Sequence, residues 1–224
     1  MGKQAQTGGI RLNCRKEDLL LYAVTDRRWL QGHTLYEQVQ EALQGGITML
    51  QLREKKLAEQ EFLEEAVQMK RLCGRYHVPL IINDDPKIAQ RADADGVHIG
   101  QEDLDLCSTR AILGPDKIIG VSARTVEQAV LAQEQGADYL GVGAVFQTGT
   151  KQDAKVISFE RLAEICRSVT IPVVAIGGIT EDNMDKLKSS GISGIAVVSA
   201  VFAQKDIRQV VKRLREKAMQ VTLP

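Results

Sequence analysis

The chain has 224 residues, and its 29 basic and 29 acidic side chains balance to no formal net charge at pH 7. Such a chain has no global field to steer it to nucleic acid or to a membrane surface, so any anion site must be built locally. Aromatic residues make up only 4% of the chain, which argues against the base-stacking surfaces of proteins that bind single-stranded nucleic acid. We therefore expect no nucleic-acid partner.

Hydropathy and cysteine spacing indicate the compartment. No stretch approaches the roughly 20 apolar residues of a membrane span, so no membrane partner is expected. Residues 1–18 lack the apolar core of a signal peptide. Cys14, Cys73, Cys107 and Cys166 lie far apart and form no CxxC pair. We expect reduced thiols in a cytoplasmic protein, with no metal or redox motif built from cysteine.

Short apolar runs alternate with amphipathic segments along the chain. Strands are expected at 20–26, 48–53, 80–83, 96–100, 118–122, 139–146, 173–177 and 194–199. Helices are expected at 35–43, 61–75, 126–135, 159–169, 183–189 and 207–218. Near-continuous apolar strands separated by helices indicate a parallel sheet.

Eight strand–helix units in 224 residues predict an α/β fold, a single parallel eight-stranded (β/α)8 TIM barrel. We place the barrel domain at residues 18–224 and interpret residues 1–17 as a loose N-terminal extension without an assigned role. An open doubly wound sheet is the alternative, because periodicity does not show whether a sheet closes. In a barrel of this type the active site lies at the C-terminal ends of the strands.

Charged residues follow the second strand, in the run Gln51-Leu52-Arg53-Glu54-Lys55. Alternation along a strand places Gln51, Arg53 and Lys55 on one side. If that side faces the barrel mouth, a guanidinium and an ammonium group converge there. The alternative is a surface loop that carries two ordinary charges.

Carboxylates follow the third and fourth strands, at Asp84 and Asp103, with the carboxamide of Asn83 beside them. Neighbouring strand ends bring the two carboxylates together. They suit Mg²⁺, a hard ion that takes one or two protein carboxylates and fills its shell with water and substrate phosphates. Asp85 before Pro86 is typical of a helix N-cap, so we assign Asp85 as the cap and Asp84 as the metal ligand.

Other polar residues near the strands have more ordinary alternatives. Ser122, at the end of the fifth strand, could donate to a substrate oxygen or be a small polar residue of a strand end. Thr125 has the sequence context of a helix cap rather than of a ligand. His33, His77 and His98 are scattered, and we expect each to be structural or exposed rather than catalytic.

The sixth strand leads into the loop Thr148-Gly149-Thr150-Lys151. Glycine lets backbone N–H groups approach an anion, threonine hydroxyls donate to phosphate oxygens, and lysine adds a positive charge. The loop is predicted to bind phosphate, and a solvated turn is the alternative. Residues 147–156 hold little apolar surface, so we expect a mobile lid that orders when substrates bind.

Gly178 follows the seventh strand, and a helix start at Val198 and Ser199 follows the eighth. These features predict a backbone cradle for a second phosphate. The strand ends then form two anion subsites, a metal side that suits a diphosphate and a neutral cradle that suits a monophosphate. No lysine lies inside the sixth strand, so a Schiff base there is not supported.

Seven short motifs occur in order along the chain. They are QLREK at 51–55, INDD at 82–85, DGVHIGQED at 95–103, GVSA at 120–123, GAVFQTGTK at 143–151, AIGGI at 175–179 and VVSA at 197–200. Together they resemble the thiamine-phosphate synthase family, and the resemblance runs from about Leu21 to about Phe202.

The resemblance implies a transferase that joins 4-amino-2-methyl-5-hydroxymethylpyrimidine diphosphate to a thiazole phosphate, giving thiamine phosphate and pyrophosphate. In that family pyrophosphate leaves first, with assistance from Mg²⁺, and the thiazole nitrogen captures the pyrimidine carbocation. Mg²⁺ and cationic side chains would stabilise the charge on the leaving group, and a closed site would keep water from the cation.

The resemblance also implies the site residues. Asp84 and Asp103 would hold Mg²⁺, and Arg53, Lys55, Ser122 and Lys151 would be catalytic. Substrate contacts are implied for Gln51, Leu52, Arg53, Glu54, Lys55, Asn83, Ser122, Thr148, Gly149, Thr150, Lys151, Gly178, Val198 and Ser199.

Two departures and two rival functions accompany the resemblance. Gln147 stands where many members have proline, and Arg124 stands where histidine is common. A thiazole tautomerase on the same barrel would carry a histidine near Ala144 and would lack the Thr-x-Thr-Lys loop. A non-catalytic phosphate-binding barrel would not need the paired carboxylates with Arg53 and Lys55. The sequence is compatible with a homo-oligomer.

Overall fold

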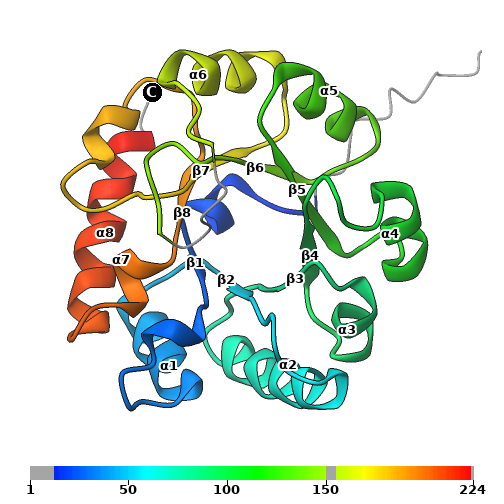
Figure 1. Cartoon of the computed structure of the whole chain (residues 1–224), viewed down its shortest axis with the longest axis vertical. Coiled ribbons are helices and arrows are strands. Elements are labelled where there is room, and N and C mark those ends of the chain that lie inside the picture. Colours follow the sequence, from blue (N-terminus) through cyan, green and yellow to red (C-terminus); the bar gives the residue numbers. More distant parts are fainter. Residues whose placement is uncertain (1–12, 150–154, 223–224) are drawn as a thin grey trace, which may run out of the picture.

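The computed structural model describes residues 13–149 and 155–222, and its strands form a closed barrel (Figure 1). Neighbouring strands are parallel and follow one another in chain order. They are β1 (Leu21–Val24), β2 (Met49–Leu52), β3 (Leu80–Asn83), β4 (Gly96–Ile99), β5 (Ile118–Ala123), β6 (Tyr139–Gly143), β7 (Val173–Ile176) and β8 (Gly194–Val197). The ring closes where Tyr22 pairs with Ala196. The predicted (β/α)8 barrel is confirmed, and the open-sheet alternative is wrong.

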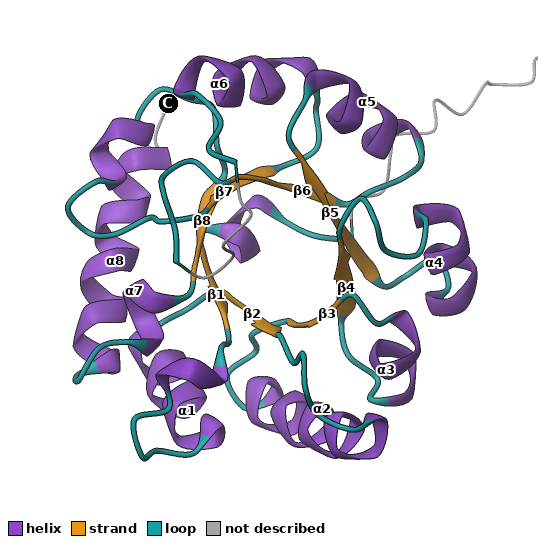
Figure 2. Ribbon diagram, viewed as in Figure 1, coloured by secondary structure: helices purple, strands orange, loops and turns teal. Residues whose placement is uncertain are grey.

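Helices surround the barrel on the outside, as Figure 2 shows. They are α1 (Leu35–Gly45), α2 (Glu59–Gly74), α3 (Pro86–Arg91), α4 (Leu106–Leu113), α5 (Val126–Glu134), α6 (Phe159–Ser168), α7 (Ser199–Phe202) and α8 (Ile207–Thr222), with 3₁₀ turns η1 (Lys16–Leu19), η2 (Arg27–Trp29) and η3 (Met184–Leu187). In the described part of the chain, no helix has the length and apolar composition needed to cross a lipid bilayer.

Two helical segments differ from the sequence-based expectation. The segment expected as a helix at 183–189 is the 3₁₀ turn η3. The periodicity did not indicate α4, because only Leu106 and Thr109 of its residues are buried. The caps follow the sequence: Asp85 accepts from the N–H groups of Lys87 and Ile88 at 2.9 Å, as predicted.

Alternation along the strands divides the core into two layers. On β2, Leu50 and Leu52 pack outward against the helices, whereas Met49 packs inside the barrel. The inner layer also holds the aromatic rings of Tyr22 and Tyr139, whose centroids are 5.9 Å apart. The interior of the barrel is therefore packed with side chains and does not form a pore.

Residues 13–19 close the amino-terminal end of the barrel and are visible in blue through the ring in Figure 1. Cys14 and Leu19 pack into the inner layer, with 1% and 0% of their surface exposed. Asn13 donates its backbone N–H to Asp138 at 3.0 Å, and Asp138 also pairs with Arg110 at 2.8 Å. The expected boundary at residue 17 falls within this packed segment, of which Cys14 is buried and Asn13 bonds to Asp138.

Replacing Asp138 with alanine should lower the free energy of unfolding by about 3 kcal/mol, because it removes the carboxylate that pairs with Arg110 and accepts from the backbone N–H groups of Asn13 and Ile119. Urea denaturation at neutral pH measures the change. The control Glu164→Ala removes an exposed ion pair with Arg161 on α6 and should cost less than about 0.5 kcal/mol. Equal losses in the two variants would contradict the anchoring role of Asp138.

Candidate active site

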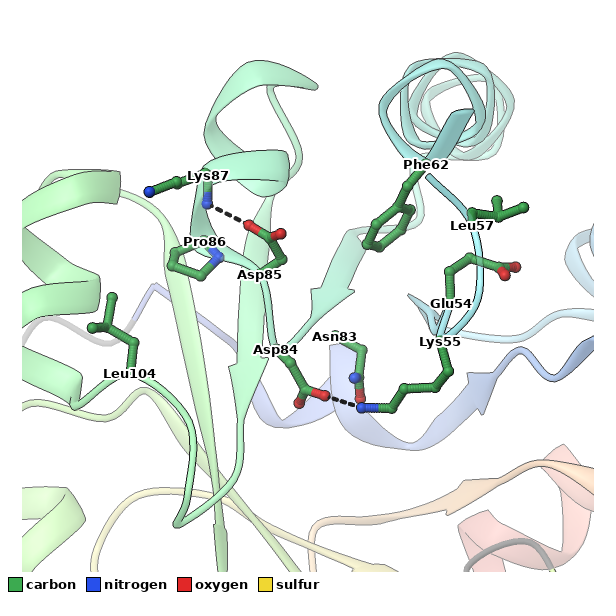
Figure 3. Close-up of a pocket in the computed structure, with 10 residues that line it drawn as sticks. All are labelled: Glu54, Lys55, Leu57, Phe62, Asn83, Asp84, Asp85, Pro86, Lys87 and Leu104. Carbon is green, nitrogen blue, oxygen red and sulfur yellow. Dashed lines mark hydrogen bonds and ion pairs between the residues drawn. The ribbon is translucent and has the colours of Figure 1, made fainter. Parts of the chain in front are cut away.

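Lys55 and Asp84 form an ion pair where β2 and β3 end (Figure 3). Asp84 adopts a left-handed backbone conformation, with φ of 64°, and donates its N–H to the carbonyl oxygen of His98 at 2.9 Å. This conformation is uncommon for a residue with a side chain and concentrates at functional sites. The backbone thus directs the carboxylate of Asp84 to Lys55 while Asp85 caps α3.

Asp103 brings a second carboxyl group to Asp84. Its Oδ2 accepts from the N–H of Gly100 at 2.6 Å, and a Cβ at Gly100 would lie only 3.0 Å from that oxygen. Burial, together with the contact with Asp84, raises the pKa of Asp103. Burial also pushes the pKa of Asp84 upward, but hydrogen bonding, with that from Lys55 first, outweighs it and lowers the pKa. Two carboxyl groups that resist being charged together form a site that favours a cation.

The donor chemistry of this pair fits Mg²⁺. Across residues 13–149 and 155–222, no group of three or more His, Cys, Asp or Glu side chains could hold a metal ion. Two hard carboxylate donors match an ion that usually keeps several waters and takes its other ligands from phosphates. The protein could therefore hold Mg²⁺ here together with a phosphate ligand.

A cavity of about 410 Å³ lies beside the ion pair, between the start of α2 and the start of α3. Figure 3 shows the Phe62 ring on one side of it and Asp85 with Pro86 on the other. Its apolar lining is Leu57, Phe62, Pro86 and Leu104, and its polar lining is Glu54, Lys55, Asn83, Asp84, Asp85 and Lys87. The cavity suits a molecule with charged and apolar parts.

Asp26, at the end of β1, organises the arginine side chains of the barrel mouth. Its carboxylate accepts from Arg28 at 2.7 Å and lies 3.6 Å from Arg53. Burial raises the pKa of Asp26, but the hydrogen bonds from Arg28 outweigh it and lower the pKa overall. Arg28 also donates to the carbonyl oxygen of Gly149 at 3.2 Å, which joins the loops after β1 and β6. The sequence pattern assigned no role to Asp26 or Arg28, although both lie within four residues of the end of β1.

Gln51 and Ser122 are linked through the barrel interior by hydrogen bonds. Gln51 Nε2 donates to Tyr22 Oη at 2.7 Å, and the hydroxyls of Tyr22 and Tyr139 are 2.8 Å apart. His98 continues the chain, with Nδ1 3.0 Å from Tyr139 Oη and Nε2 2.9 Å from Ser122 Oγ. Desolvation inside the barrel lowers the pKa of His98 to about 4, so its ring is neutral at pH 7. His98 is therefore bonded to a predicted catalytic residue, a link that sequence spacing did not reveal.

The predicted phosphate cradle lies at the ends of β7 and β8. Gly177 and Gly178 have left-handed φ angles of 102° and 64°. A Cβ at Gly178 would lie 2.3 Å from the carbonyl oxygen of Gln147, so only glycine lets the two loops approach this closely. Val198 precedes α7, and the first N–H groups of a helix, starting at Ser199, have no intrahelical acceptor.

Several predicted residues are placed differently or lie outside the described residues. Leu52 is fully buried between the barrel and the helices, so only its backbone can meet a substrate. Glu54 turns its carboxylate to Arg27 at 2.9 Å. Thr150 and Lys151 lie outside the described residues, as does half of the expected lid at 147–156 (residues 150–154), whereas Thr148 and Gly149 fall within them.

Behind the run that carries Arg53 and Lys55, Glu54 lies against Glu65 of α2. Arg27 bridges the two carboxyl groups, with contacts of 2.9 and 2.6 Å. Within the described part of the chain, Glu54 Oε1 and Glu65 Oε2 are buried without a hydrogen-bond partner. Burial first, and then the contact with Glu65, raises the pKa of Glu54 to about 7. A proton shared between these two oxygens would satisfy both.

Comparison with known proteins identifies the family. A family model described as thiamine monophosphate synthase matches residues 21–201. The chain belongs to this family. Thiamine-phosphate synthases from Ruminiclostridium cellulolyticum and Clostridium tetani are 52% and 50% identical to it, over 90% and 88% of the chain and 96% and 94% of their own lengths. The solved thiamine phosphate pyrophosphorylase from Pyrococcus furiosus, 41% identical, has a TM-score of 0.85 and covers 92% of the chain and 98% of its own.

As a member of the thiamine-phosphate synthase family, the chain is an enzyme of thiamine biosynthesis. It is a transferase that condenses a pyrimidine with a thiazole moiety. The family and the activity implied by the sequence motifs are confirmed. Relatives named as synthases at about half identity over most of the chain disfavour the tautomerase and the non-catalytic barrel.

Glu65→Gln should make the free energy of unfolding less sensitive to pH. Because the pKa of Glu54 is raised to about 7, the folded state holds a proton that the unfolded state has lost, and stability falls as pH rises toward 7. The introduced amide would donate to Glu54 without titrating. Urea denaturation at about pH 5 and pH 8 should show a smaller loss for this variant than for the wild type. Glu64→Gln is the neighbouring control, and identical losses in all three proteins would exclude the shared proton.

Proposed function

We propose that the strand ends bind a pyrimidine diphosphate on the Asp84–Asp103 side and a thiazole phosphate on the Gly178–Ser199 side, and join them with release of pyrophosphate. The observation that carries this proposal is that the carboxyl groups of Asp84 and Asp103 contact each other, with the ammonium group of Lys55 paired to Asp84. Carboxylates suit a metal ion, and an ammonium group suits the phosphates bound to it. Figure 1 places β3 and β4 across the ring from β7 and β8, so two substrates can lie side by side.

Asp84 and Asp103 would hold Mg²⁺, with Asn83 beside them. When bound, the ion would offset negative charge on the diphosphate and so favour its departure as pyrophosphate. Lys55 is 52% exposed at its side chain, so its ammonium group can turn from Asp84 to a phosphate oxygen. On substrate binding, Lys55 would exchange Asp84 for a phosphate oxygen, and Asp84 would be free to bind the metal ion.

Arg53, Lys55, Ser122 and Lys151 would stabilise the charge that grows on the leaving diphosphate. Arg53 is well placed for this role, because Thr25 Oγ1 accepts its backbone N–H at 2.9 Å and Asp26 holds its guanidinium. The role of Lys151 rests on the family motif alone. We propose that the bond to the diphosphate breaks before the thiazole nitrogen attacks, so the site must shield a short-lived pyrimidine cation from water.

The remaining predicted residues would position the substrates. Gly178, Val198 and Ser199 would bind the thiazole phosphate through backbone N–H groups. Thr148, Gly149 and Thr150 would close over that phosphate from the β6 side. Gln51, Asn83 and the backbone of Leu52 would contact the pyrimidine diphosphate, while Glu54 would act from behind by holding the Arg53–Lys55 run in place.

We place this reaction in the cytoplasm. Cys14, Cys73, Cys107 and Cys166 are free thiols in the structure, which supports a reducing compartment. The fold is compatible with a homo-oligomer, and light scattering of the purified protein would give its mass in solution.

Incubation with pyrimidine diphosphate, thiazole phosphate and Mg²⁺ should give thiamine phosphate and an equal amount of pyrophosphate. Mass spectrometry of the mixture measures both products, and EDTA should stop the reaction. Isomerised thiazole phosphate without consumption of the pyrimidine would instead support a tautomerase. Binding of thiazole phosphate without turnover would support the non-catalytic barrel.

Asp84→Asn should lower the rate at least about 100-fold, because it removes a hard anionic ligand while nearly keeping the shape of the side chain. Asp103→Asn should behave alike. Asp85→Asn is a matched control at the next position, and it should stay near wild-type activity because asparagine also caps helices well. Full turnover of Asp84→Asn or Asp103→Asn, in the presence or absence of EDTA, would contradict the metal assignment.

A further inference from the structure

The hydrogen-bonded chain inside the barrel joins two residues that the proposed function places on the substrate. It runs from Gln51 on β2 through Tyr22, Tyr139 and His98 to Ser122 on β5. Each of its four links measures between 2.7 and 3.0 Å. The chain therefore crosses the interior without a break, and each of its three inner members has a partner on both sides.

We propose that these side chains form one directed donor chain, from Gln51 to Ser122, that leaves the hydroxyl proton of Ser122 free for an oxygen of the diphosphate. Tyr22, Tyr139 and His98 are then positioning residues, which act on the substrate only through Ser122. This inference rests on the proposed function, because it takes the anion beside Ser122 to be the diphosphate.

The direction follows from counting protons along the chain. The amide nitrogen of Gln51 carries only donors, so Tyr22 accepts from it, and Tyr139 Oη at 2.8 Å is the acceptor within reach of the Tyr22 proton. Tyr139 then gives its proton to Nδ1 of His98, which must be unprotonated. A neutral imidazole with a bare Nδ1 carries its proton on Nε2 and donates it to Ser122.

An anionic ligand selects the same direction. Diphosphate oxygens carry no proton to give to a hydroxyl, so Ser122 must donate to them rather than accept. If the chain ran the other way, Ser122 would give its proton to His98 and would turn a lone pair toward the negative charge. The direction that starts at Gln51 avoids this repulsion.

The barrel makes room for this chain with glycine at two interior positions. A Cβ at Gly120 would lie 2.1 Å from the Tyr139 ring, and a Cβ at Gly141 would lie 2.9 Å from the His98 ring. Both contacts are closer than real side chains allow. β5 and β6 therefore accommodate the two rings only because glycine, which has no side chain, stands at these two positions. The interior thus leaves space for the Tyr139 and His98 rings among aliphatic side chains such as Met49 and Ile81.

The tautomer of His98 tests the direction without any turnover. Histidine labelled with ¹⁵N allows NMR to show which ring nitrogen carries the proton, and His98→Gln assigns its signals among the three histidines. The full chain is measured alone and with Mg²⁺ and inorganic pyrophosphate. We expect the proton on Nε2 in both samples. A proton on Nδ1 in the pyrophosphate sample would overturn the proposal.

A double-mutant cycle tests whether Tyr139 acts through Ser122. Tyr139→Phe should lower kcat about 10-fold, with little change in KM for the thiazole phosphate. Ser122→Ala should lower kcat about 100-fold. The double variant should be no slower than Ser122→Ala alone, because the proton that Tyr139 directs is already gone. Losses that multiply would show an independent, structural role of Tyr139 and would overturn the proposal.

Two further variants keep the test decisive. Tyr36→Phe removes a tyrosine hydroxyl on α1, outside the chain, and should leave kcat unchanged. If thermal denaturation shows that Tyr139→Phe does not fold, Tyr22→Phe breaks the chain one link earlier and takes its place in the cycle, with a smaller loss of kcat expected. If the wild type makes no thiamine phosphate, the proposed function fails, while the His98 tautomer still supports or overturns the chain.

Discussion

The pairing of β8 with β1 is the constraint on which the rest of the structure depends. Once the sheet closes, every second side chain of each strand must fit into one shared interior, and all carboxyl ends must meet at one rim. Gly120 and Gly141 satisfy the first demand by leaving space for two rings. The second demand brings Lys55, Asp84 and Asp103 together, because they follow the neighbouring strands β2, β3 and β4.

At the mouth of this barrel, carboxylates hold the side chains of arginine and lysine in fixed orientations. Asp26 fixes Arg28 and lies beside Arg53, and Asp84 holds Lys55. Cationic groups that are already oriented need little reorganisation when charge develops nearby, which is the main source of electrostatic catalysis. The same residues lie on loops after β1, β2 and β3, so the proposed substrate site is assembled by tertiary contacts rather than by any single loop.

Local patterns predicted the features that depend on neighbours in the chain. Strand alternation, the Asp85–Pro86 cap and each strand-end motif depend only on residues close together in the chain. The structure contains the cap and the eight strands in the expected order. What the sequence did not reveal depends on distant partners. His98 meets Tyr139, 41 positions away, and Asn13 meets Asp138, 125 positions away. The contacts of Glu54 with Arg27 and Glu65 likewise depend on positions that only the folded barrel defines.

The segment that packs into the amino-terminal end of the barrel covers one end of its interior. Cys14 and Leu19 share the inner layer with the rings of Tyr22 and Tyr139, and Gln51 and Ser122 bond to this interior near the carboxyl ends of β2 and β5. A ligand bound at the carboxyl ends of these strands would cover the interior from the other side. The protons of the interior hydroxyls would then exchange with bulk solvent more slowly for as long as that ligand stays bound.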